Sequence, residues 1–168
     1  MTGTDHYGRV YVTADWHIGH NADTVRSQSG INSRLFDLMK FAQVLGGAAA
    51  LTGSTVSPSL IVTAGDVFDS PNPSNEDRAA LVRLVSHLVG NSESTHVALM
   101  PGNHDCDLQW SSLSGMEGWE YQRKVMVVGA YPLRLSPNTL LVPNPTREEL
   151  VKMESEAGFM SWVSRTAG

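Results

Sequence analysis

The stretch Leu60-Ile61-Val62-Thr63-Ala64-Gly65-Asp66-Val67-Phe68-Asp69 decides the fold. Residues 60–64 are mostly apolar or β-branched, which is typical of a short buried strand. Gly65 and Asp66 then end the strand, because glycine and aspartate favour turns. The segment therefore predicts a buried strand with carboxylates close behind its last residue.

Two more segments repeat this arrangement of a strand followed by polar side chains. Residues 9–14 (Arg-Val-Tyr-Val-Thr-Ala) predict a strand, and the sequence Asp15-Trp16-His17 follows at once. Residues 96–100 (His-Val-Ala-Leu-Met) predict another strand, which runs through Pro101 into Gly102-Asn103-His104-Asp105. Carboxylates, imidazoles and an amide thus follow three successive strands.

Between these strands the hydrophobic pattern changes to the period of a helix. Apolar residues recur at spacings of three and four over residues 34–45, which predicts an amphipathic helix that ends at Gly46. Ser74, with Asp77 three residues later, predicts the N-cap of a second helix, which the Gly90-Asn91 pair ends. We interpret its apolar face as core, with a surface for binding another protein as the alternative: Ala80, Leu81, Leu84, Val85 and Leu88.

The order strand, helix, strand, helix, strand predicts a parallel α/β sheet with right-handed crossovers. Beyond residue 105 the pattern is weaker: residues 125–128 and 139–142 predict strands, and residues 145–149 predict the start of a last helix. In a parallel sheet the carboxyl ends of the strands lie at one edge, where such folds bind ligands. The three polar clusters should therefore meet in space.

Composition excludes several classes of protein. The chain of 168 residues has 41% hydrophobic and 17% charged residues, as expected of one folded domain. A net charge of −5 argues against a protein that holds nucleic acid chiefly through a basic surface. One cysteine, Cys106, excludes an internal disulfide and a Cys-rich zinc site. Because residues 1–9 lack an export signal and no apolar run approaches the roughly 18 residues of a membrane span, we expect a soluble cytoplasmic protein without a membrane partner.

The polar clusters offer a mixed set of oxygen and nitrogen ligands for a divalent cation. Carboxylate, imidazole and amide oxygen suit manganese, iron, zinc or magnesium, and the clusters lack the thiolates that select zinc or iron–sulfur clusters. Each cluster alone could be ordinary turn chemistry, since aspartate and asparagine are common in turns. Three such clusters at three successive strand ends favour a metal site.

The chain resembles the calcineurin-like metallophosphoesterases in three motifs: Asp15-x-His17, Gly65-Asp66-x-x-Asp69 and Gly102-Asn103-His104-Asp105. The residues that flank these motifs narrow the resemblance to the SbcD-type DNA-repair nucleases, over residues 8–110. The resemblance implies an α/β fold: the parallel-sheet half of a layered α-β-β-α sandwich, truncated. It would form one compact domain over residues 8–168, with residues 1–7 as a flexible terminus.

The resemblance also implies metal ligands. Asp15 and His17 would hold one ion, Asp66 would bridge two, and Asn103 would bind the second through its side-chain oxygen. Two such cations hold a phosphate and stabilise the charge that develops during in-line attack. Mn²⁺ is the expected metal, as one or two ions, with Mg²⁺, Fe²⁺ and Zn²⁺ as alternatives.

Further roles follow from the same resemblance. His104 would be the general acid that protonates the leaving oxygen, and Asp105 would orient or charge-stabilise its imidazole. Asp69 would either support the ligands or be an ordinary loop acid. We interpret Trp16 as core packing, with stacking on the substrate as the alternative.

The chain departs from the family after His104. The family's remaining metal ligands are histidines, one isolated and two in a Gly-His-x-His pattern, and no histidine follows His104 here. By family expectation, the first metal lacks one protein ligand and the second lacks two. His20 is the best substitute ligand, with a solvent-facing loop histidine as the alternative. We expect His87 and His96 to be structural, and His6 to lie in the terminus.

Three explanations for these departures stay open. The chain is an N-terminal half that another polypeptide completes, a compact enzyme in which one metal or an unexpected ligand suffices, or a binding protein that keeps the fold. The leading hypothesis is a metal-dependent phosphodiesterase that hydrolyses DNA as an exonuclease or endonuclease. Its partner would be an SbcC-type ATPase, a related nuclease chain or a second copy. The alternatives are an enzyme acting on a small nucleotide and a catalytically inactive interaction module.

Overall fold

The computed structural model describes residues 7–20, 32–90, 92–106, 112–113, 124–128, 133–136 and 139–141. The main sheet has the order β1-β2-β3-β4 and consists of parallel strands: β1 Arg9–Thr13, β2 Ser59–Ala64, β3 Thr95–Met100 and β4 Val125–Val127. The predicted parallel α/β fold is confirmed. Because β1, β2 and β3 run in the same direction, the segments that follow them begin at one edge of the sheet.

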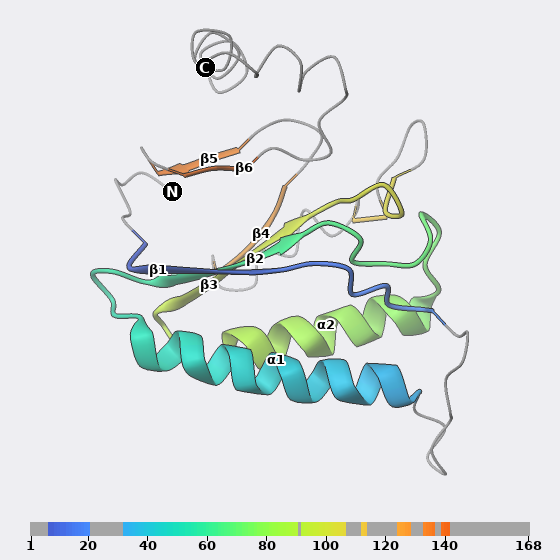
Figure 1. Cartoon of the computed structure of the whole chain (residues 1–168), viewed down its shortest axis with the longest axis horizontal. Helices are drawn as coiled ribbons and strands as arrows, with labels where there is room; N and C mark the ends of the chain where they lie inside the picture. Colours follow the sequence, from blue (N-terminus) through green and yellow to red (C-terminus); the bar gives the residue numbers. More distant parts are fainter. Residues whose placement is uncertain are drawn as a thin grey trace, which may run out of the picture.

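Two helices, α1 (Ser33–Thr52) and α2 (Asn75–Val89), cover the same face of this sheet (Figure 1). A hydrophobic core lies between the helices and the strands, and its sheet side includes Ile61 and Val97. The apolar face of α2 is fully buried in this core, so the interpretation of that face as core is confirmed: Ala80, Leu81, Leu84, Val85 and Leu88.

Helix α1 is longer than its hydrophobic pattern predicts. We expected it to end at Gly46, but it continues to Thr52. Gly46 is buried against α2, where a Cβ would lie 2.5 Å from the backbone oxygen of His87. Glycine here permits close helix packing instead of ending the helix. The alanines at residues 48–50 then favour helix strongly, so the chain stays helical.

Helix α2 begins with the predicted capping box. The N–H of Asp77 donates to Oγ of Ser74 at 3.1 Å, and the N–H of Ser74 donates to Oδ2 of Asp77 at 2.9 Å. These bonds satisfy backbone groups that a helix start otherwise leaves unpaired. They fix the first turn of α2 just after the segment that follows β2.

A hairpin of β5 (Leu133–Ser136) and β6 (Thr139–Leu141) lies over the opposite face of the sheet (Figure 1). Strand β6 was predicted, whereas the hydrophobic pattern did not predict β5. A second apolar cluster joins the hairpin to the sheet: Leu60, Val62, Ala98, Val128 and Leu141, with Leu133 and Leu135 packed against them. The helix predicted from residue 145, and His6, lie outside the described residues.

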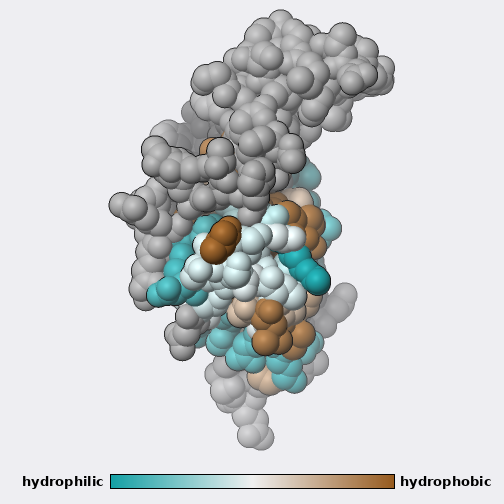
Figure 2. All heavy atoms as spheres, turned by 90° about the vertical axis from the view of Figure 1, so that its left-hand side faces the viewer, coloured by the Kyte–Doolittle hydropathy of each residue, from teal (hydrophilic) through white to brown (hydrophobic). Residues whose placement is uncertain are grey.

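Two apolar side chains of β1, the edge strand of the described sheet, are exposed on this second face. Val10 and Val12 are 48% and 68% exposed, whereas Leu60 and Val62, their partners in register on β2, are buried. Apolar side chains of α1 are also exposed: Phe36, Phe41, Val44 and Leu51. At the end of the molecule seen in Figure 2, apolar side chains form separate patches between hydrophilic ones.

Helix α1 differs from the expectation that no apolar segment is as long as a membrane span. The helix is 20 residues long and contains an 18-residue window with a mean hydropathy of 1.2, so it is long and apolar enough to cross a membrane by length and composition alone. Ala42, Gly46 and Ala49 are nevertheless buried, and the helix packs on α2 and the sheet. The buried residues of α1 therefore belong to the hydrophobic core of the domain.

Candidate metal centre

The segments that follow β1, β2 and β3 meet at the carboxyl edge of the sheet. The N–H of His17 donates to the backbone oxygen of Asp66 at 2.9 Å, and Ile18 forms a parallel bridge with Phe68. The N–H of His104 donates to Oδ1 of Asp66 at 3.0 Å. The structure therefore brings all three motifs together around Asp66.

Asp15, His17 and Asp66 share an unusual backbone conformation. Their φ angles are 56°, 44° and 51°, and no other non-glycine residue in the described part of the chain has a positive φ. This left-handed conformation costs an L-amino acid roughly 1–2 kcal/mol. Such strain tends to collect at functional sites. The strained residues are three of the four that the resemblance indicates as metal ligands.

The side chains of these three residues can reach one ion. Ligand atoms of Asp15, His17 and Asp66 lie within 4.8 Å of one another. Two carboxylates and one imidazole are a donor set for Mn²⁺, Fe²⁺, Zn²⁺ or Mg²⁺. Asp15 is exposed, and His17 and Asp66 are half-buried, so a bound ion would be open to water and substrate. The residues present fit a divalent cation.

Gly102 lets the third motif approach Asp66. A Cβ at Gly102 would overlap both the carboxylate and the backbone nitrogen of Asp66, so only glycine fits there. Asn103 follows in this turn and is exposed. The turn that carries Asn103 is thus held against the proposed bridging ligand, and the role of its amide oxygen as a ligand stays a prediction.

Asp69 is surrounded by imidazoles. Nδ1 of His20 lies 3.1 Å from each of its carboxylate oxygens, and Nδ1 of His17 lies 3.2 Å from Oδ1. His104 places its Nδ1 3.3 Å from the backbone oxygen of Asp69, and its ring meets that of His17 edge-on, with centroids 4.8 Å apart. Asp69 and His20, whose roles the sequence left open, therefore belong to the same cluster as the proposed ligand and the proposed general acid.

Asp105 has a structural role that the sequence did not indicate. It is completely buried, and its carboxylate accepts hydrogen bonds from the N–H groups of Val67 and Phe68 at 2.9 and 2.7 Å. The N–H of Gly102 and the hydroxyl of Ser112 donate to it as well. These four bonds involve three backbone N–H groups and one hydroxyl, and a role of Asp105 in orienting or charge-stabilising the His104 imidazole stays a prediction. Asp105 ties the segment after β2 to the turn after β3, because its two oxygens satisfy donors from both.

Arg34 is a site residue that the sequence pattern did not indicate. Its Nη2 donates to the backbone oxygens of Asp15 and Trp16, both at 3.3 Å, and so holds the first motif from the start of α1. No periodicity relates an arginine in a first helical turn to a segment that precedes it. Trp16 itself is 2% exposed and its Nε1 donates to Oγ1 of Thr13, so its interpretation as core packing is confirmed.

The other two described histidines lie away from the motifs. His96 occupies the start of β3, where its Nδ1 is 3.3 Å from the hydroxyl of Tyr7. His87 is in the last turn of α2. Both are at the edge of the sheet opposite the three motifs, as expected of structural residues.

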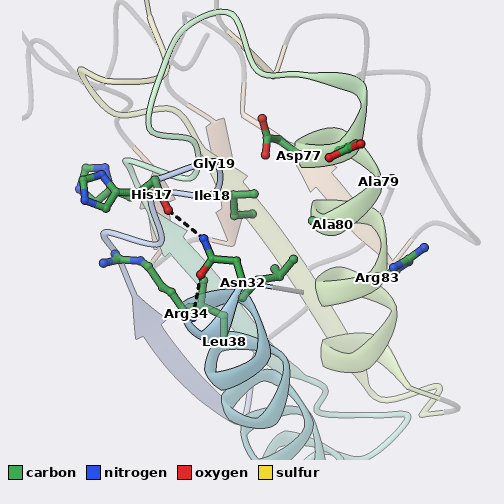
Figure 3. Close-up of a pocket in the computed structure, with 13 residues that line it drawn as sticks. His17, Ile18, Gly19, Asn32, Arg34, Leu38, Asp77, Ala79, Ala80 and Arg83 are labelled. Carbon is green, nitrogen blue, oxygen red and sulfur yellow. Dashed lines mark hydrogen bonds between the residues drawn. The ribbon is translucent and has the colours of Figure 1, made fainter. Parts of the chain in front are cut away.

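A cleft of about 340 Å³ opens beside the metal ligands, with α1 and α2 as its walls (Figure 3). His17 and His20 line it on the side of the first motif. Asn32 also lines it, and its amide nitrogen donates to the backbone oxygen of His20 at 3.1 Å. Leu38 and Ala80 contribute apolar surface from the two helices. The cleft therefore joins the metal group to a partly apolar space.

Comparison with known proteins agrees with this geometry. The sequence matches the family described as calcineurin-like phosphoesterase over residues 8–162. It is 30% identical over 97 residues to the SbcD subunit of nuclease SbcCD from Escherichia coli K12, and 32% identical over 97 residues to its counterpart from Rhodobacter capsulatus. Each match covers 58% of this chain and 21% of the relative, so the matched region spans about a fifth of the length of these relatives.

The family match and the two relatives indicate the same class of reaction. The matched family consists of phosphoesterases that use divalent metals, and the relatives are nucleases by name. Both describe hydrolases of phosphoesters, in agreement with the donor set at the carboxyl edge of the sheet. Since the family match extends over nearly the whole sequence, this chain belongs to the calcineurin-like phosphoesterase family.

Proposed function

We propose that this chain is a metal-dependent phosphodiesterase that hydrolyses DNA, with Mn²⁺ as its metal. The observation that carries the proposal is the convergence of Asp15, His17 and Asp66, each in a strained left-handed conformation, within 4.8 Å at the carboxyl edge of the sheet. The relatives from nuclease SbcCD support DNA as the substrate. A divalent ion bound there would polarise the phosphate and make a bound water nucleophilic.

His104 is suited to protonate the leaving oxygen. Its Nδ1 lies 3.3 Å from the backbone oxygen of Asp69, and a carbonyl oxygen can only accept a hydrogen bond. Nδ1 therefore carries the hydrogen of this contact, and Nε2 is the nitrogen that gains and loses the mobile proton. The side chain is exposed beside the metal ligands, so a phosphodiester held there can reach it. This is the arrangement that general acid catalysis requires.

A partner chain would complete this enzyme. The chain has a net charge of −5, so a separate protein, such as an SbcC-type ATPase, would supply most of the grip on DNA. The exposed apolar side chains of Val10 and Val12 on the edge strand β1 support such a contact, because a paired strand or a covering element would bury them. A related nuclease chain could also bring the histidine ligands that do not follow His104 here.

A small nucleotide is the second candidate substrate. The cleft of about 340 Å³ beside His17 and His20 is within the usual size range for a small-molecule pocket. Its apolar wall could hold a base while the phosphate reaches the metal ligands. An enzyme that contacts only the backbone of DNA would not need this cleft, whereas an enzyme that binds a nucleotide base would.

Cleavage assays with matched variants test the proposal. The purified chain with Mn²⁺ is given single-stranded DNA, double-stranded DNA ends, a mononucleotide and a chromogenic phosphodiester. Cleavage of DNA that is lost in Asp66→Asn and kept in Asp37→Asn, an exposed carboxylate on α1, supports the nuclease. Cleavage of the mononucleotide alone favours the second candidate. Bound Mn²⁺ without any cleavage, also after addition of a candidate partner chain, would identify an interaction module instead.

A further inference from the structure

The cluster around Asp69 forms a second group of metal-ligand atoms. Atoms of His17, Asp69 and His104 lie within 4.8 Å of one another, the same limit that holds for the Asp15 group. Nδ1 of His17 and Oδ1 of Asp69 are 3.2 Å apart, close to the roughly 3.4 Å between two ligands of a tetrahedral zinc ion. Both groups include His17.

Nδ1 of His17 is a buried polar atom without a hydrogen-bond partner among the described residues. The atom is shielded from solvent and makes no aligned hydrogen bond among the described residues, although a carboxylate oxygen lies 3.2 Å away. A buried polar atom without a partner is costly. A cation between His17 and Asp69 would satisfy both atoms at once, since each would bind it through a lone pair.

We propose that His17, Asp69 and His104 form a Zn²⁺ site that competes with the Asp15–His17–Asp66 group. Two imidazoles and one carboxylate are a zinc donor set, whereas the Asp15 group has two carboxylates and suits harder ions. Nδ1 of His20, 3.1 Å from both oxygens of Asp69, holds that carboxylate in place beside the ion.

The two groups exclude each other because they share His17. A neutral imidazole has one nitrogen with a free lone pair, so His17 can bind only one ion at a time. Zinc at Asp69 therefore removes His17 from the Asp15 group and weakens Mn²⁺ binding there. By reciprocity, Mn²⁺ weakens zinc binding by the same factor. Zinc also engages His104, so it would inhibit hydrolysis; this consequence rests on the proposed function, whereas the site itself does not.

Metal-binding measurements test the site without any need for activity. Zinc affinity is measured by competition with a chromogenic chelator, for the parent, Asp69→Asn, His104→Ala and Asp15→Asn. We expect zinc to bind roughly 10- to 100-fold more weakly, or worse, after either of the first two changes, and as tightly as in the parent after Asp15→Asn. His87→Ala is the matched control for a histidine outside the cluster. Circular dichroism confirms that each variant is folded.

Mn²⁺ binding supplies the second readout. Free Mn²⁺ is followed by electron paramagnetic resonance with and without one equivalent of Zn²⁺. Zinc should lower the affinity for Mn²⁺ in the parent and leave it unchanged in Asp69→Asn. Zinc binding that is lost in Asp15→Asn and kept in Asp69→Asn would place zinc in the Asp15 group and overturn the proposal. Independent binding of both ions, or no tight zinc binding by the parent, would also overturn it.

Discussion

The backbone N–H of His104 donates a 3.0 Å hydrogen bond to Oδ1 of Asp66, a residue of the preceding strand-end motif. The proposed general acid is thus hydrogen-bonded directly, through its backbone, to the proposed bridging ligand. Because this bond uses the backbone of His104 and Nδ1 contacts the backbone oxygen of Asp69, Nε2 is the ring nitrogen left to act on the substrate. The bond to Asp66 uses one lone pair of its carboxylate and leaves the others for metal.

Replacing Asp66 by asparagine should weaken Mn²⁺ binding more than any other single change at the site. Asparagine keeps the oxygen that accepts from His104 but removes the negative charge that every ion at this position would use. Calorimetric titration with Mn²⁺ checks this, with Asp37→Asn as the control for loss of an exposed carboxylate. A variant that binds Mn²⁺ as tightly as the parent would show that Asp66 is not a ligand.

Replacing His104 by alanine should slow phosphodiester cleavage by roughly 10² to 10⁴, the usual contribution of a general acid. Mn²⁺ content should stay unchanged, because the Asp15 group does not include His104. Turnover and Mn²⁺ content are measured on the same preparation. Loss of both together would mean that His104 binds the catalytic ion, and the assignment as general acid would be wrong.

The site's location could be predicted because it depends on a general property of parallel sheets. Runs of β-branched residues indicated β1, β2 and β3, and the carboxyl ends of parallel strands meet at one edge, so Asp15, Asp66 and His104 had to converge. The end of α1 could not be predicted in this way. Gly46 is typical of a helix end in the sequence, and only the structure shows that it is instead a point of close contact with the backbone of α2.

The hydrogen-bond partners of Asp105 could not be predicted from the sequence either. Its place directly after His104 suggested that it orients that imidazole, whereas its carboxylate accepts from the N–H groups of Val67 and Phe68. Backbone N–H groups are present at nearly every residue, so no pattern of side chains reveals which of them a buried carboxylate will bind. The same holds for Arg34, whose partners are backbone oxygens.

Replacing Asp105 by asparagine should therefore destabilise the fold. An amide offers one acceptor oxygen and places an NH₂ group against backbone N–H donors, so we expect a loss of about 3 kcal/mol in the free energy of unfolding. Urea denaturation measures it, with Asp37→Asn as the exposed control. Unchanged stability combined with slower turnover would instead support the role beside His104 that the motif suggested.

Replacing Gly102 by alanine should disrupt the metal centre. The added Cβ would overlap the carboxylate and the backbone nitrogen of Asp66, so the turn after β3 and the segment after β2 would have to separate. We expect weaker Mn²⁺ binding together with a lower thermal midpoint. Gly47→Ala is the matched control, because a Cβ there meets nothing within 4 Å. Normal Mn²⁺ binding by Gly102→Ala would show that the two segments need not be this close.

The last prediction concerns how many ions the chain holds. Asp15, His17 and Asp66 give one ion three protein ligands, whereas a second ion would have only Asp66 and Asn103. Waters can complete the coordination of a hard divalent ion, but two protein ligands retain it weakly. We therefore expect one Mn²⁺ per chain at moderate concentration, with the Asn103 position filled only at high Mn²⁺.

Metal analysis after removal of free Mn²⁺, and anomalous scattering from crystals soaked in Mn²⁺, measure the number and position of the ions. Asn103→Ala should leave the occupancy of the first position unchanged, because that position does not use the amide. Cleavage by the isolated chain should accordingly be weak, and it should rise when a histidine-bearing partner chain completes the second position. Two fully occupied Mn²⁺ positions and rapid DNA cleavage by the chain alone would contradict this prediction. They would require ligands beyond Asp66 and Asn103 at the second position.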